Sequence, residues 1–217
     1  MLGLFNDEEK RKMMIKKTRR FLEKGFEKGK VGVQKAWEEY REERARRERD
    51  KAYEEDYEAE FRFREGDIDF RMLISAEEAR LYERARRKLK EVKLIHSDSR
   101  VHQQWESKKY LTLHDYFTEK IQHYYQRRNE DPVALHRTIR FCERQIEYAP
   151  VAVRAYRMDP YNFSLPEHPG YETLISLYEE VGEWHEALRL ARKAKKQGWE
   201  GDWDARIREL EDRGGTL

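Results

Sequence analysis

The feature that most constrains this chain is a pair of adjacent helical patterns near its C-terminus. Tyr171, Leu174 and Tyr178 recur at the spacing of one helix face, and Gly182 follows them. Glycine readily adopts the left-handed conformation that ends many helices, so we expect a helix to stop there. A second apolar series follows at once, and its small residues allow two helices to approach closely: Ala187, Leu188, Ala191 and Ala194. The sequence therefore predicts a tight antiparallel helix pair over residues 168–198.

This helix pair resembles a tetratricopeptide repeat, which carries an aromatic residue, a leucine and a tyrosine on its first helix and small residues on its second. The residues that fit the pattern are Tyr171, Leu174, Tyr178, Gly182, Trp184, Ala187, Ala191 and Ala194. Three positions depart from the family. Ile175 stands where the family favours glycine, Ala191 where it favours a larger apolar residue, and Trp199 near its closing proline. The resemblance covers about 34 residues.

A weaker copy of the same pattern lies earlier in the chain. Shifting the helix pair back places Tyr178 on Tyr125, Leu174 on Ile121 and Leu188 on Leu135. The copy is degenerate because Gln122 and Thr138 replace apolar residues. We expect its two helices over 112–148, the second ending toward Pro150, and an insertion over 150–168. A terminal helix carrying Trp203, Ile207 and Leu210 is expected to cap the last pair.

The N-terminal half is predicted to be a charged helical arm over 1–110, followed by the tetratricopeptide-like domain over 111–217. A helix should begin at Asn6, break near 25–33, and continue as a solvated helix over 34–60.

Two interpretations remain open for residues 61–74. Alternation of Phe61 and Phe63 before Gly66 favours a β-hairpin. The alternative continues a helical stripe from Tyr53 and Tyr57. Ser75 and Glu78 then form a capping-box pattern that opens a helix reaching about Lys93. Residues 94–113 lack a clear period and are expected to be a connector, with Asp98 capping a turn.

Composition favours a mainly α-helical protein. Charged residues make up 41% of the chain, yet the net charge is only +2, which suits solvated helical surfaces. The single cysteine, Cys142, cannot form an internal disulfide and is expected to be buried and inert. No apolar stretch approaches the length of a transmembrane helix, so we expect a cytoplasmic protein without a membrane span.

The resemblance to tetratricopeptide repeats implies a scaffold that binds a peptide or helix of another protein. The groove positions carried over from the family are Glu119, His123, Gln126, Arg127, Glu172, Ser176, Glu179 and Glu180. The sequence has no glycine-rich phosphate loop, nucleophile elbow or paired catalytic acids, so we expect no enzyme activity and no cofactor. Glu119 and His123 stand one helical turn apart, but no third ligand lies at motif spacing, and no metal site is expected.

The main alternative is a nucleic-acid-associated accessory protein. Residues 10–20 contain seven cations and no acid: Lys10, Arg11, Lys12, Lys16, Lys17, Arg19 and Arg20. A second basic cluster occupies 84–90, with Arg84, Arg86, Arg87, Lys88 and Lys90. Clustered cations attract phosphates. A third alternative is a structural subunit of a larger assembly, which leaves self-association open.

Overall fold

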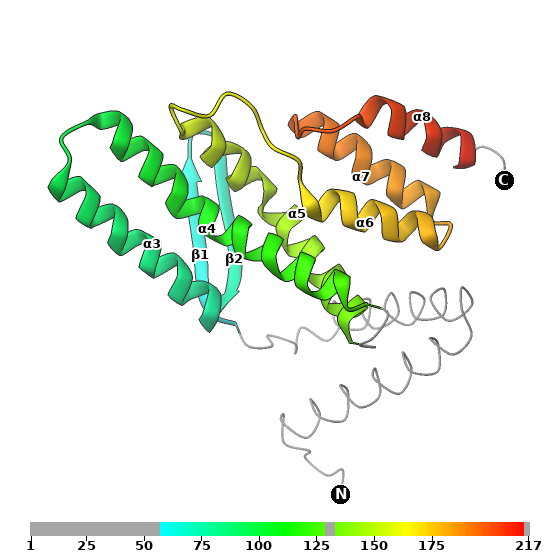
Figure 1. Ribbon diagram of the computed structural model, residues 1–217, viewed down its shortest axis with the longest axis horizontal. Coiled ribbons are helices and arrows are strands. Elements are labelled where there is room, and N and C mark those ends of the chain that lie inside the picture. Colours follow the sequence, from blue (N-terminus) through cyan, green and yellow to red (C-terminus); the bar gives the residue numbers. More distant parts are fainter. Residues whose placement is uncertain (1–56, 129–132, 215–217) are drawn as a thin grey trace, which may run out of the picture. The chain divides into compact units, whose positions relative to one another are not determined.

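The computed structural model describes residues 57–128 and 133–214 (Figure 1). These residues form a two-stranded antiparallel sheet and six helices, which confirms the predicted mainly α-helical class with a small β-hairpin. Of the described residues, 57–121 and 140–214 belong to one compact unit, and 122–128 and 133–139 belong to a second. The predicted N-terminal helix, its break, the solvated helix and the basic residues 10–20 lie outside the described residues.

The β-hairpin is confirmed and is longer than expected. Strand β1 (Tyr57–Glu65) pairs with β2 (Ile68–Ser75), and Glu65 stands opposite Ile68. The two-residue turn between them requires a positive φ, and Gly66 supplies it at 58°. One face of the hairpin is buried through four apolar side chains: Phe61, Phe63, Met72 and Ile74. The helical alternative for this segment is therefore wrong.

Helix α3 (Ala76–Ile95) begins with the predicted capping box, because Ser75 Oγ accepts the Glu78 N–H at 3.3 Å and Glu78 Oε2 accepts the Ser75 N–H at 2.8 Å. The expected connector over 94–113 is wrong beyond its first residues, since helix α4 (Ser99–Gln126) begins at Ser99. Asp98 does cap this start, accepting the Arg100 N–H at 2.8 Å. The expected domain boundary between residues 110 and 111 falls inside α4.

Helix α5 (Ala134–Met158) runs antiparallel to α4. Tyr148 Oη donates to the Tyr110 carbonyl and Gln145 Nε2 to the His114 carbonyl, so positions later in α5 meet positions earlier in α4. We expected this helix to end toward Pro150, but it continues for eight residues beyond the proline. Proline removes one backbone hydrogen bond. Burial of Val151, Ala152 and Ala155 on the following turns offsets this loss.

The C-terminal region consists of α6 (Pro169–Glu180), α7 (Trp184–Gln197) and α8 (Trp203–Gly214). Helices α6 and α7 form the predicted antiparallel pair, with Gly182 at φ 77° in their turn. The small residues Ala187, Ala191 and Ala194 of α7 are fully buried, as the close-approach argument requires. Helix α8 buries Trp203 and Leu210, and it begins where the terminal helix was expected.

Candidate partner-binding cleft between α6 and α8

A concavity lies beside α6, and we call it the α6–α8 cleft. It measures about 350 Å³ and separates the exposed side of α6 from the first turns of α8. Helix α6 contributes Glu172, Ile175 and Ser176 to its lining. The facing wall comes from α8 and the residues before it: Gly201, Asp202, Trp203, Ala205, Arg206 and Glu209.

Arg206 fixes α8 across α6 at the edge of the cleft. Its Nε and Nη2 atoms donate to the two carboxylate oxygens of Glu179 at 2.8 and 2.6 Å, and Nη2 also donates to Ser176 Oγ at 3.2 Å. Two parallel bonds to one carboxylate are the geometry in which arginine is most selective. Two predicted residues, Ser176 and Glu179, are thus held by the protein's own terminal helix.

Glu172 remains available to a ligand. It is exposed at the cleft and forms no hydrogen bond or ion pair within the described part of the chain. Partial burial, followed by the neighbouring Glu167 carboxylate, raises the pKa of Glu172, while Arg206 acts in the opposite direction. The cleft therefore combines one unpaired carboxylate with an apolar wall from Trp203.

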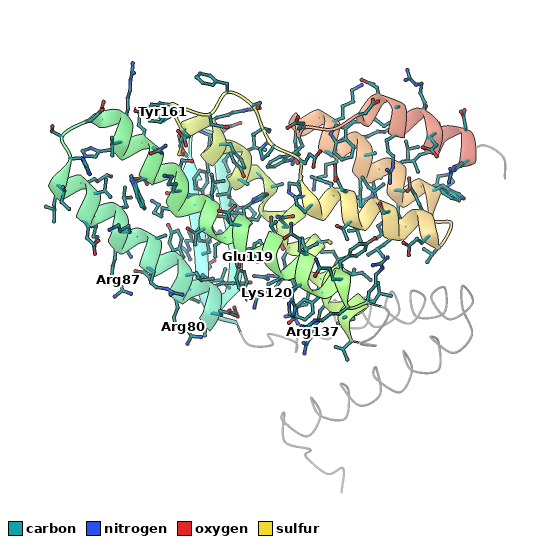
Figure 2. All side chains as sticks on the ribbon, viewed as in Figure 1. Arg80, Arg87, Glu119, Lys120, Arg137 and Tyr161 are labelled. Carbon is teal, nitrogen blue, oxygen red and sulfur yellow. The ribbon has the colours of Figure 1, made fainter. Side chains whose placement is uncertain are left out.

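The remaining predicted groove residues do not contribute to the α6–α8 cleft. Glu180 is exposed on the last turn of α6. Glu119 is exposed on α4, where Figure 2 marks it, and His123 and Gln126 are exposed farther along the same helix. Arg127 is exposed in the turn that follows.

Sequence reasoning missed Arg206, although it singled out Trp203 on the same helix. The available signal was spacing, since Arg206 lies three residues after Trp203 and therefore near the same helix face.

Three further features bear on the chemistry of the described residues. Within 57–128 and 133–214, no group of three His, Cys, Asp or Glu side chains could hold a metal ion. Cys142 is buried, as predicted, and burial raises the pKa of its thiol. None of the described helices has the length and apolar character needed to cross a membrane.

In comparisons with known proteins, no family model matches the chain, and no curated protein and no solved structure matches it either. The arguments for function therefore come from the geometry and chemistry of the chain itself.

Proposed function

We propose that this protein is a non-enzymatic, cytoplasmic adaptor that binds a peptide or helix of another protein through the α6–α8 cleft. The observation that carries the proposal is the position of the cleft on α6. It opens on the helix face where the resemblance to tetratricopeptide repeats places Glu172 and Ser176. The kinship of α6 and α7 to that family is part of the proposal.

The size and lining of the cleft suit a side chain rather than a folded domain. A volume of about 350 Å³ lies near the lower end for ligand pockets. Trp203 lines the cleft as an apolar side chain that is 8% exposed, while Glu172 and Asp202 place carboxylates at the exposed rim. A partner segment with an apolar stem and a donor group at its end satisfies both.

The pair of α6 and α7 supports the proposal better than the pair of α4 and α5, because its helices are shorter. Helices α6 and α7 are 12 and 14 residues long, whereas α4 and α5 are 28 and 25 residues long. Both pairs are antiparallel, but α4 and α5 are twice the length of the second pair. We therefore assign the adaptor role to the cleft between α6 and α8, and the groove positions on α4 stay a prediction.

The test is affinity capture from a nuclease-treated lysate, followed by titration of the captured protein. We expect Ser176→Trp, which fills the cleft, to abolish binding that the wild-type protein shows. Glu180→Arg is the matched control, because Glu180 is an exposed acid of the same helix outside the cleft lining. Equal binding by wild type and Ser176→Trp, with both variants folded, would overturn the proposal.

A further inference from the structure

Three arginines form a stripe along the exposed side of α3. Arg80, Arg84 and Arg87 are separated by four and three residues, which places them on one face of a helix. All three are exposed, and Figure 2 shows Arg80 and Arg87 along the outer side of α3. The helix as a whole carries seven basic against four acidic residues.

The stripe is only partly neutralised by its surroundings: after Tyr116 and Lys120, Arg80 also helps to lower the pKa of Glu77. Glu83 accepts from Arg86 at 3.0 Å and Glu91 from Lys88 at 3.1 Å, so these acids are already paired with other cations. Glu77 accepts from Tyr116 and Lys120 of α4. None of the three stripe arginines forms an ion pair with a residue in the described ranges. Within residues 57–128 and 133–214, their guanidinium donors are therefore available to a ligand.

A shallow cavity of about 620 Å³ runs beside the stripe. The stripe arginines form one side of it, and Ala59 of β1 with Ala76 and Ala79 of α3 supplies small side chains at its surface. Small residues let a bulky polymer backbone approach the helix closely. Glu83 also lines the cavity, so the lining carries three guanidinium groups against one carboxylate and has a net positive charge.

The chemistry and spacing suit consecutive phosphates. A guanidinium offers two parallel donors that match a phosphate, which an ammonium cannot do. Arg80 and Arg87 are seven residues apart, so at about 1.5 Å rise per residue they span about 10 Å of helix axis. Phosphates on one strand of a duplex recur about every 3.4 Å along its axis, so the stripe spans about three of them.

We propose that the α3 arginine stripe, Arg80, Arg84 and Arg87, binds the phosphate backbone of a nucleic acid without reading its sequence. This surface is separate from the proposed adaptor cleft, so the two proposals are tested independently of each other. A nucleic-acid strand fits a concave surface. A flat anionic bilayer could not follow this concave surface, which disfavours it.

Two triple variants of the full chain test the proposal at equal change of charge. The stripe variant combines Arg80→Gln, Arg84→Gln and Arg87→Gln. The control combines Arg86→Gln, Lys88→Gln and Lys90→Gln on the same helix, two of which are ion-paired. The probes are a fluorescent duplex of 20 base pairs, the single strand of the same sequence, and phosphatidylserine vesicles, titrated at several salt concentrations.

We expect the wild type to bind a nucleic-acid probe, and the stripe variant to bind it at least tenfold more weakly. The slope of log affinity against log salt should fall in magnitude by about two to three for the duplex. The control variant should change affinity less than threefold. Equal loss in both variants, no loss in the stripe variant, or no nucleic-acid binding by the wild type would overturn the proposal. The proposal would also be overturned if the stripe variant lost binding to the vesicles but kept its binding to both nucleic-acid probes.

Discussion

At the scale of single residues, one buried amide joins three helices of the larger unit. Gln145 of α5 donates to the His114 carbonyl at 3.1 Å and to Thr118 Oγ1 at 2.6 Å on α4. Its Oε1 accepts the Gly170 N–H at 2.7 Å on α6. These partners satisfy the hydrogen-bonding groups of the buried Gln145 amide. The loss of any one of them would leave a buried polar group without a hydrogen bond, which would destabilise the fold. Side-chain contacts of this kind cannot be read from helical periodicity.

The buried ion pair between Arg144 and Glu78 gives the first prediction. Arg144 Nη2 lies 2.7 Å from Glu78 Oε2, and both side chains are at most 10% exposed. Arg144→Met leaves a buried carboxylate without its cation, so we expect a loss of about 3–5 kcal/mol in the free energy of unfolding. Adding Glu78→Gln removes the stranded charge and keeps a capping oxygen, so about half of the loss should return.

Urea denaturation measures both variants. Arg189→Met is the control, since Arg189 pairs with Glu186 at the surface, and it should cost less than about 1 kcal/mol. A double variant no more stable than Arg144→Met would contradict the buried-charge argument.

His168 gives a prediction about pH. Its Nδ1 accepts the Tyr171 N–H and caps α6, and its ring packs against Trp199 with centroids 4.5 Å apart. Burial, followed by the neighbouring His114 ring and to a smaller extent Lys193, holds the pKa of His168 well below its ordinary value of 6.5. The unfolded chain therefore binds a proton that the folded chain does not, and stability is lost as pH falls below about 6.5. One such group contributes up to about 1.4 kcal/mol per pH unit.

Denaturation at several pH values between 7.5 and 5 checks this. His168→Asn keeps an oxygen that can cap α6 but does not titrate, so its stability should fall less steeply below pH 6.5 than that of the wild type. His185→Asn changes an exposed histidine and should keep the wild-type slope. Parallel pH profiles for His168→Asn and the wild type would show that His168 is not the group that titrates.

At the scale of elements, the sequence predicted only those helix ends that are set by residues close in the chain, and it mispredicted the start of α4 and the end of α5. The capping box at Ser75 and the glycine at 182 act within a few residues, so sequence alone located two helix ends, whereas at Gly66 it left a hairpin and a helix both open. The part of α4 before residue 112 was missed because its interior includes Ser107 and Lys109, whose burial breaks the expected apolar period. In the candidate cleft, Glu172 and Ser176 of α6 came from the resemblance to tetratricopeptide repeats, whereas α8's position across them depends on tertiary contacts of Arg206.

The packing of α6 against α5 gives a prediction at this scale. A Cβ on Gly170 would lie 2.7 Å from Gln145 Oε1 and 3.1 Å from the Cys142 carbonyl oxygen. Helix propensity alone favours alanine by about 1 kcal/mol. Because the contact with the α5 backbone cannot be relieved by a rotamer change, we expect Gly170→Ala to destabilise the fold by about 1–3 kcal/mol instead.

Gly214→Ala is the comparison for Gly170→Ala, since its Cβ would meet only Trp184 Cβ at an ordinary 3.5 Å. Thermal unfolding of both variants should lower the Tm for Gly170→Ala only. A Tm for Gly170→Ala at or above the wild-type value would show that α6 and α5 separate easily.

At the scale of the whole molecule, α8 covers a surface that the pair of α6 and α7 would otherwise expose. Its buried side chains are Trp203 and Leu210. Nη2 of Arg192 on α7 also forms an ion pair with Oε1 of Glu211 on α8 at 2.5 Å. Stacked helix pairs require such a terminal cap, because an open apolar face recruits another copy. The sequence predicted a helix here from its apolar stripe, while the cleft beside that helix became visible only in three dimensions.

The last prediction follows from that role of α8. Leu210→Ala removes a fully buried side chain, and Leu to Ala changes in cores cost about 2–5 kcal/mol. If α8 acts as a cap, weakening it should expose the apolar faces of α6 and α7, so the variant should gain mass with concentration in light scattering. Arg208→Ala changes an exposed residue of the same helix and should behave as the wild type does. A destabilised Leu210→Ala that keeps one mass at every concentration would show that α8 contributes stability without preventing association.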